Sequence, residues 1–208
     1  MVPDLITSEV EALCALAHEC SRRGWVPATS GNFSVRDVAT GRIHISRSGL
    51  DKGQMTPADL LVLNSDGNVT RGSGKPSAEA RLHVVVYDAR PEVHAIAHVH
   101  TVWNTLLSAR FADVGHVDIS GYELLKALSD VRSHTYRERV PVIANAQDYH
   151  TLARELEEVL HENPLAHGTL LSAHGLYTWG KSVADARRHL EALEFLFEVE
   201  GRKLFREL

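Results

Sequence analysis

Hydrophobic residues recur at three- and four-residue intervals in several parts of the chain, which is the spacing of an amphipathic helix. Residues 6–20 follow this spacing, and the basic pair Arg22-Arg23 followed by Gly24 is typical of a helix end. Residues 182–197 show the same spacing near the C-terminus. We therefore predict a helix in each segment. Further helices are predicted over residues 77–90, 101–107, 120–128 and 152–159.

Between these helices, hydrophobic residues alternate with polar ones or form short apolar runs, as they do in strands. Phe33 and Val35 alternate in this way, as do Ile43 and Ile45. The polar segment 37–41 separates the two pairs, so a hairpin is predicted. Other strands are predicted over residues 92–100, 140–143, 169–173 and 176–179.

Several residues indicate where these elements begin. Thr56 is expected to cap a helix that has Pro57 at its first position and leads into the apolar run 60–63. Ser77 is expected to cap the next helix. Pro141 cannot donate a hydrogen bond to a neighbouring strand, so it is expected at a sheet edge or at a strand start.

Length, composition and charge are those of an ordinary globular protein. The chain has 208 residues, is 44% hydrophobic and 24% charged, and intersperses strands and helices without a repeat or a linker. We therefore predict one α/β layered domain over residues 1–208. The formal net charge of −5 argues against nucleic acid as a partner. No apolar run approaches the roughly 18 residues of a membrane span, so no membrane partner is expected.

The two cysteines, Cys14 and Cys20, fall six positions apart on different faces of the first predicted helix. That arrangement favours neither a disulfide nor a metal site. The N-terminus has no basic region followed by an apolar one, so no signal peptide is visible. A reduced protein in the cytoplasm is expected.

The stretch His98-Val99-His100 closes one of the predicted strands. Alternate residues of a strand project from one face with a rise of about 3.3 Å each, so both imidazoles can turn onto one ion. A catalytic zinc site takes three protein ligands and keeps one position open. His174 is the best candidate for the third, because it ends another apolar run and Gly175 leaves room beside its ring. The opposite strand face, expected to pack on a core, is formed by Val93, Ala95, Ala97 and Val99.

An alternative explanation of the histidine pair is chance. The chain contains 13 histidines, so one pair at this spacing is unremarkable by itself.

Three short segments combine small polar residues with glycine at the edges of regular elements. Exposed backbone N–H groups, hydroxyl donors and a helix N-terminus together suit an anion such as phosphate. Each segment alone is as consistent with a plain turn. Gly74-Lys75 does not complete a Walker loop, so nucleoside triphosphate binding is disfavoured. The three segments are Thr29-Ser30-Gly31-Asn32, Ser46-Arg47-Ser48-Gly49 and Lys75-Pro76-Ser77.

Two glutamates are candidates for proton transfer. Glu79 lies in the first turn of its predicted helix, where a structural role would be to offset the positive end of the helix. Ser120 and Glu123 have the spacing of a capping box, in which the glutamate bonds back to the first N–H of the helix. From spacing alone, Glu123 is structural.

Taken together, these residues resemble the zinc-dependent class II aldolase family, also called the aldolase/adducin-head family. The matching segments follow the family's order and cover nearly the whole chain. The segments shared with the family are Ser30-Gly31-Asn32, Ser48-Gly49, Lys75-Pro76-Ser77-Ala78-Glu79, His98-Val99-His100 and His174-Gly175. Those that resemble its dehydratases of methionine salvage are Ser48-Gly49-Leu50-Asp51-Lys52-Gly53, Gly121-Tyr122-Glu123-Leu124-Leu125-Lys126, Asn145-Ala146-Gln147-Asp148 and His174-Gly175-Leu176-Tyr177-Thr178-Trp179-Gly180.

The resemblance implies a central, largely antiparallel sheet flanked by helices, and a homotetramer with active sites at subunit interfaces. It implies one zinc ion per subunit, held by His98, His100 and His174. The substrate would be a phosphorylated ketose that loses a hydroxyl group as water through a zinc-stabilised enediolate. Glu79 matches the acid/base and metal neighbour of the aldolases. Glu123 matches the proton donor and acceptor of the dehydratases, which reverses its structural interpretation, and burial in an interface pocket would raise its pKa.

Other members of the family provide the alternatives. A class II sugar-phosphate aldolase or 4-epimerase shares the ligand pattern, and a non-catalytic module like the adducin head shares the fold. Ala78 departs from a serine that is common in the phosphate loop of the aldolases, which leaves that loop's contribution open. Trp103, Tyr122 and Tyr149 are candidate neighbours of a methylthio group on the substrate.

Overall fold

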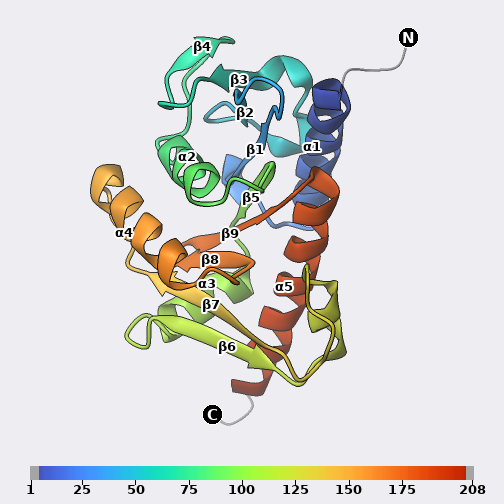
Figure 1. Cartoon of the computed structure of the whole chain (residues 1–208), viewed down its shortest axis with the longest axis vertical. Helices are drawn as coiled ribbons and strands as arrows, with labels where there is room; N and C mark the ends of the chain where they lie inside the picture. The colour runs from blue at the N-terminus through green and yellow to red at the C-terminus, as the bar shows by residue number, and fades with distance from the viewer. Residues whose placement is uncertain (1–4, 205–208) are drawn as a thin grey trace.

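Nine strands form one mixed sheet in the part of the chain that the structure, a computed structural model, describes, residues 5–204 (Figure 1). From one edge to the other they are β4 (Val69–Arg71), β3 (Leu60–Leu63), β2 (Ile43–Ser46), β1 (Asn32–Arg36), β5 (Ala95–Val99), β9 (Gly175–Gly180), β8 (Gly168–Leu171), β7 (Arg137–Ile143) and β6 (His116–Ser120). Within these residues all neighbouring strands are antiparallel except β7 and β8. The predicted largely antiparallel sheet is confirmed.

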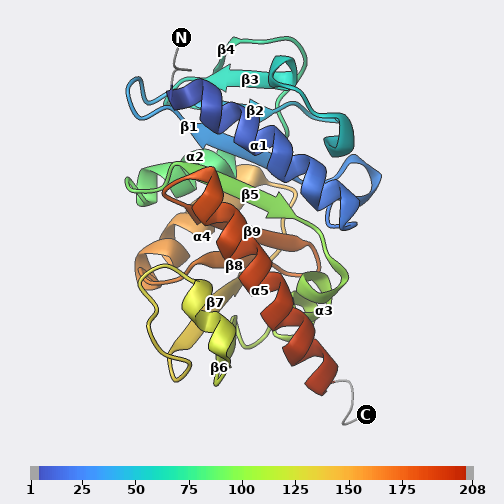
Figure 2. The ribbon, with the colours of Figure 1, turned by 90° about the vertical axis from the view of Figure 1, so that its right-hand side faces the viewer.

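Helices cover both faces of this sheet. The α-helices are α1 (Leu5–Arg22), α2 (Ala80–Ala89), α3 (Val102–Arg110), α4 (Tyr149–Glu162) and α5 (Val183–Leu204). Buried side chains of α1, α3 and α5 share one hydrophobic core, and those of α2 and α4 share a second. Figure 2 shows α1 and α5 lying across the same face of the sheet. Short 3-10 helices are η1 (Pro27–Thr29), η2 (Lys52–Gln54), η3 (Pro57–Asp59) and η4 (Glu123–Ala127).

The strongest sequence patterns give the predicted elements. The first helix ends at Arg22, and Gly24 follows it with φ 71°, a left-handed conformation that favours glycine. The predicted hairpin pairs β1 with β2, Ser34 opposite Ile45. The final helix, α5, begins one residue after Ser182.

Strand β5 has the predicted division of its two faces. Ala95, Ala97 and Val99 are buried in the core beneath α1 and α5. Val93 was expected on that face, but it precedes the strand and packs in the other core. His98 is completely buried on the face opposite the three apolar residues.

Two predicted helices differ from those in the structure: one is reduced to a single turn, and the other begins later than expected. Residues Pro57–Asp59 form only one turn, because the apolar run that follows is β3, inside the sheet. Helix α2 begins at Ala80 rather than at Ser77. The hydroxyl of Ser77 instead accepts a hydrogen bond from the N–H of Glu79, 3.2 Å away, in a turn that precedes the helix.

The helix predicted to open at Ser120 is also different. Ser120 is the last residue of β6 and pairs with Arg137, so it lies outside the short helix Glu123–Ala127 and does not cap it. The expected capping box is wrong, and the carboxylate of Glu123 pairs with Lys126 instead.

Pro141 lies inside β7, which pairs with β6 on one side and β8 on the other, so the expected edge or strand start is wrong. The N–H of Val142 donates to Gly115 on the β6 side at 2.8 Å. The backbone groups of neighbouring strand residues point in opposite directions, so the backbone nitrogen of Pro141 points toward β8. Pairing with β8 begins only at Val142 and Leu170. The missing N–H of Pro141 therefore removes no ladder hydrogen bond.

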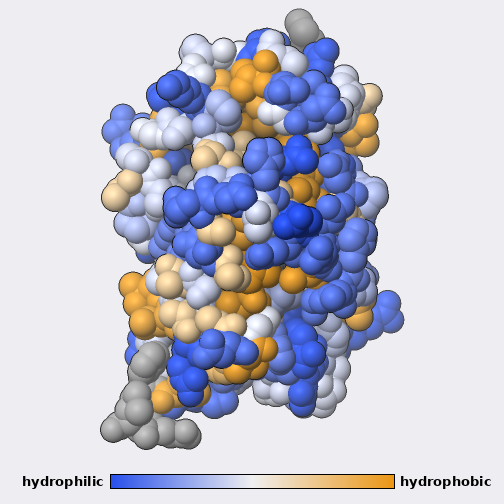
Figure 3. Space-filling view, turned by 90° about the vertical axis from the view of Figure 1, so that its left-hand side faces the viewer, coloured by the Kyte–Doolittle hydropathy of each residue, from blue (hydrophilic) through white to orange (hydrophobic). Residues whose placement is uncertain are grey.

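Hydrophobic side chains interrupt the polar surface, most extensively in the lower half of the face in Figure 3. No helix among the described residues is both long and apolar enough to cross a bilayer. Both cysteines are buried and free.

Exposed apolar side chains are available to partners or ligands. The large ones in residues 5–204 are Val38, Val69, Val102, Leu106, Val114, Leu124, Leu165 and Phe195.

Candidate active site

The fold brings the three predicted metal ligands together. His98 lies in β5, His100 follows the end of that strand, and His174 lies in the turn that leads into β9. Because β5 and β9 are adjacent, this turn lies beside the end of β5. Gly175 permits the close approach, since a Cβ at that position would lie 2.4 Å from the carbonyl oxygen of Val99.

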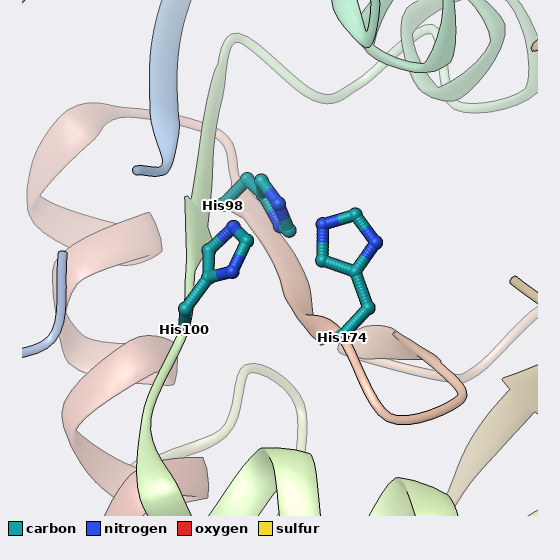
Figure 4. A group of neighbouring side chains, drawn as sticks. All are labelled: His98, His100 and His174. Carbon is teal, nitrogen blue, oxygen red and sulfur yellow. The ribbon is translucent and has the colours of Figure 1, made fainter. Parts of the chain in front are cut away.

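The histidine rings face one another, as Figure 4 shows. One nitrogen from each ring lies within 4.8 Å of the others, close enough for small side-chain rotations to place all three on one ion. The ring centroids of His98 and His100 are 4.5 Å apart, and those of His100 and His174 are 4.7 Å apart. The Nε2 atoms of His98 and His100 are buried without a hydrogen-bond partner in the described chain. Such atoms fit a metal ion, because an unpaired buried nitrogen is otherwise costly.

Hydrogen bonds from the opposite ring nitrogens orient these ligands. Nδ1 of His98 donates to the carbonyl of Leu176 at 3.0 Å, which leaves its Nε2 lone pair free. Nδ1 of His174 lies 3.3 Å from Oδ1 of Asn145. Bonds of this kind fix the tautomer of metal-binding histidines. Burial also lowers the pKa of His98 well below its ordinary value, so its ring is neutral.

Glu79 brings a carboxylate to the same point. Its Oε1 lies 3.1 Å from Nε2 of His174, and its Oε2 lies 3.4 Å from Nε2 of His98. Asn32 donates a hydrogen bond of 2.6 Å to Oε2. Burial alone would raise the pKa of Glu79, but the hydrogen bond with His174 and the nearby histidines lower it below the ordinary range. The group is therefore an ionised carboxylate, able to contact a metal or to accept a proton.

A pocket of about 260 Å³ adjoins Glu79 and His100. Residues of all three glycine- and serine-containing segments line it, and the side chains of Arg47 and Lys52 add positive charge. The hydroxyl of Ser30 is buried there without a hydrogen-bond partner in the described chain. These donors suit an anion. The predicted anion-binding residues that line it are Ser30, Gly31, Asn32, Ser48, Gly49 and Ser77.

Lys75 is the one predicted anion ligand that does not line this pocket. It is exposed, and its backbone carbonyl accepts a hydrogen bond of 2.9 Å from the N–H of Ser48. Lys75 therefore supports the loop through its backbone, and a phosphate contact from its side chain stays a prediction.

Comparison with known proteins identifies the family. The profile of the Class II Aldolase and Adducin N-terminal domain matches residues 11–200. The chain belongs to the class II aldolase and adducin family. This class II aldolase-type chain is 49% identical over 180 residues to the methylthioribulose-1-phosphate dehydratase of Methylococcus capsulatus, covering 86% of each protein. It is 42% identical over 193 residues to that of Sorangium cellulosum, covering 92% of this chain and 91% of the relative.

Solved structures agree with this assignment of the class II aldolase fold. The L-fuculose-1-phosphate aldolase from Thermus thermophilus matches with a TM-score of 0.76 and 24% identity, covering 97% of this chain and 98% of that one. A second L-fuculose 1-phosphate aldolase matches with a TM-score of 0.79 and 21% identity, covering 95% of this chain and 87% of that one. At this identity the likeness shows the fold alone.

Glu123 lies outside the site that a single class II aldolase subunit forms. Its side chain is 70% exposed, pairs with Lys126 and lies 3.8 Å from His134. It does not line the pocket of about 260 Å³ beside the histidines. The hydrogen bond from Lys126 lowers the pKa of Glu123. In the single chain, solvent and a cation surround the carboxylate rather than apolar groups. The raised pKa, which was expected from burial in an interface pocket, stays a prediction.

A buried hydrogen-bonded chain behind Glu79 was not predicted from the sequence. Nε2 of His83 bonds to Oδ1 of Asn32, and Nδ1 of His83 accepts from the hydroxyl of Ser34 at 2.7 Å. Burial lowers the pKa of His83 to about 4, so the ring is neutral. This arrangement turns the amide N–H of Asn32 toward Glu79. The spacing of four residues between Glu79 and His83 was an available indication, since such residues share a helix face.

Two further residues near the histidines were also missed. The ring of Tyr177 stacks on that of His98, with centroids 3.9 Å apart and planes 13° apart. The ammonium group of Lys52 is buried and donates to the carbonyls of Thr29 and Leu50, each at 2.9 Å. Burial lowers the pKa of Lys52 to about 8. Its position three residues after Gly49, within a segment that resembles the dehydratases, was the available indication.

Proposed function

We propose that this protein is a lyase that converts 5-methylthioribulose 1-phosphate to 2,3-diketo-5-methylthiopentyl 1-phosphate and water, in methionine salvage. Relatives 49% and 42% identical over most of both chains are named methylthioribulose-1-phosphate dehydratases. One observation carries the proposal: three histidines and Glu79 meet beside an anion pocket. A non-catalytic module like the adducin head would not require that arrangement.

The metal of this proposal is zinc, one ion per subunit, held by His98, His100 and His174. Zinc is supported because imidazole nitrogens are common zinc ligands and because two of these Nε2 atoms are buried without a hydrogen-bond partner in the described chain. When bound, zinc is a Lewis acid that stabilises negative charge on a ketone oxygen.

The phosphate group would bind in the pocket of about 260 Å³. Backbone N–H groups near Gly31 and Gly49 and the hydroxyls of Ser48 and Ser77 are the donors proposed for it. Lys52 adds a buried positive charge at its wall. Anchoring the phosphate there places the ketone and the adjacent carbons next to the histidines, because His100 and Glu79 line the same pocket.

Glu79 is proposed to accept the proton from C3. Its ionised state suits a base, and the hydrogen bond from Asn32 holds one oxygen so that the carboxylate keeps its orientation. Glu123 is proposed to give a proton to the departing C4 hydroxyl group. Since Glu123 does not line the pocket beside the histidines of its own chain, the proposal includes a homotetramer in which Glu123 of the partner subunit enters the site.

The experiment is an assay of the purified protein with 5-methylthioribulose 1-phosphate, first with zinc and then with a chelator. We expect formation of the diketone and water with zinc, about one zinc per chain, and loss of activity after chelation. If zinc-loaded protein leaves this substrate intact but splits a sugar phosphate to dihydroxyacetone phosphate and an aldehyde, the aldolase alternative is correct. If gentle purification yields protein with no zinc and no activity, the non-catalytic alternative is correct. A cytoplasmic location completes the proposal.

A further inference from the structure

A second, larger pocket adjoins the histidines. Its volume is about 650 Å³, and His100 and His174 form part of its wall. His100 is the residue that this pocket shares with the anion pocket among the lining residues described. The nitrogens that face the metal position therefore lie where the two pockets meet.

The walls of the second pocket differ from those of the anion pocket in their chemistry. None of the lining residues carries a carboxylate, an ammonium or a guanidinium group. The hydroxyl of Thr101 donates to Glu194 at 2.6 Å, and that of Thr105 donates to the carbonyl of His174 at 3.2 Å, so both point at protein groups. Asn145 adds an amide group, whose Oδ1 lies 3.3 Å from Nδ1 of His174. Apart from this amide and the two histidines, the wall is mainly carbon surface. The apolar lining residues are Pro27, Val102, Leu106 and Ala173.

Two of these residues present large side chains to the open space. Val102 and Leu106 lie one turn apart on α3, so they share a helix face. Their exposed fractions are 69% and 40%, against complete burial for Leu107 on the same helix. Trp103, Tyr122 and Tyr149, the candidates from the sequence, do not line this pocket, and Tyr149 lines the anion pocket.

The two ends of the proposed substrate match the two pockets in their chemistry. 5-Methylthioribulose 1-phosphate carries its phosphate at C1 and its methylthio group at C5, with the reacting carbons between them. With the phosphate in the anion pocket and the reacting carbons at the histidines, the thioether end extends into the second pocket.

We propose that Val102 and Leu106 form the subsite that receives the methylthio group, and that they set the preference for it over a C5 hydroxyl group. This inference rests on the proposed function. A thioether gains from contact with carbon surface, whereas a hydroxyl group loses its hydrogen bonds to water there. One such apolar group in a hydrophobic pocket is worth roughly 10- to 200-fold in discrimination.

The test uses the zinc-loaded enzyme and the variants Val102→Ser, Leu106→Ser and the double variant. The control is Leu165→Ser, which removes a leucine that is 72% exposed and lines neither of these two pockets. The measurements are KM and kcat for 5-methylthioribulose 1-phosphate and the inhibition constant of ribulose 1-phosphate, which has a hydroxyl group at C5. Sedimentation of each variant reports its assembly state.

We expect the double variant to raise KM for the methylthio substrate by about tenfold or more, with little change in the inhibition constant of ribulose 1-phosphate. The control should change neither value. Three results would overturn the subsite while leaving the proposed function intact. They are an equal rise in KM and in the inhibition constant, an unchanged KM, and a smaller assembly that binds both ligands equally weakly. If the wild-type enzyme does not consume the methylthio substrate, the proposed function fails first and the subsite fails with it.

Discussion

Glu194 is a buried carboxylate whose neutralisation should stabilise this protein at alkaline pH. It lies on α5, is 5% exposed, and accepts hydrogen bonds from the hydroxyl of Thr101 at 2.6 Å and the amide of Asn104 at 2.9 Å. Neither of these partners carries a charge. Burial therefore raises the pKa of Glu194 from 4.5 to about 7. The informative change is Glu194→Gln, which keeps the shape of the protonated acid.

The size and sign of the effect follow from this pKa. Because the folded-state pKa lies above the unfolded one, the fold favours the protonated form. That contribution is complete below pH 4.5 and is lost as the pH rises through about 7. Each tenfold change in proton affinity is worth about 1.4 kcal/mol, so the full pKa change corresponds to ~3 kcal/mol. Glutamine carries no such pH dependence.

The assay is urea denaturation of the wild type and of Glu194→Gln at several pH values from 5 to 8. A chelator removes metal binding from the comparison, and the protomer concentration is held constant because assembly would shift the midpoints. We expect the variant to be more stable than the wild type by ~1 kcal/mol at pH 5 and by ~3 kcal/mol at pH 8. Comparing the two proteins at each pH cancels the titration of the buried histidines, which both contain.

Glu198→Gln is the matched control, since Glu198 lies on an exposed part of the same helix and pairs with Arg202. It should show no pH-dependent difference from the wild type. A stability difference between Glu194→Gln and the wild type that was the same at pH 5 and pH 8 would show that Glu194 does not titrate with a raised pKa.

Three other variants test the proposed site. His98→Ala should lower zinc affinity by more than ~100-fold, beyond the usual effect of changing a residue that only supports a ligand, and abolish turnover; metal analysis after dialysis showing full zinc would contradict this. Glu123→Gln should retain zinc and assembly but lower kcat by ~100-fold or more, as the loss of a general acid does; unchanged kcat with a lower melting temperature would show that Glu123 only stabilises the fold. Gly175→Ala should destabilise the fold by ~1–3 kcal/mol and weaken zinc binding, because its Cβ would lie 2.4 Å from the carbonyl oxygen of Val99; unaltered stability in urea would count against the close approach.

Local patterns were sufficient to predict most elements and the three histidines. The first helix could be predicted because one apolar face, a basic end and Gly24 agree with one another. His98 and His100 could be paired because strand periodicity depends only on neighbouring residues. His174 is 74 positions from His100, and the apolar run that it ends, Gly175 beside it and the family's motif order together indicated that it would join the pair.

The errors occurred where pairing between distant segments decides the structure. Ser120 has the spacing of a helix cap, yet its pairing with Arg137 keeps it in a strand. Pro141 is tolerated inside the sheet because the neighbouring ladder starts one residue later. The bonds of Asn32 to Glu79 and His83 depend on β1 lying beside the start of α2, which no local pattern contains.

The position of Glu123 links catalysis to assembly. A group that gives a proton to a departing hydroxyl group must be protonated beforehand, and a raised pKa favours that state near neutral pH. In the single chain, the hydrogen bond from Lys126 and exposure to solvent hold the pKa of Glu123 below its ordinary value, so the carboxylate is ionised. Cover from a neighbouring subunit would remove solvent and raise the pKa. In the proposed tetramer, the contact that brings Glu123 to the histidines would therefore also make it an acid, so that an isolated subunit would bind metal without being able to complete the dehydration.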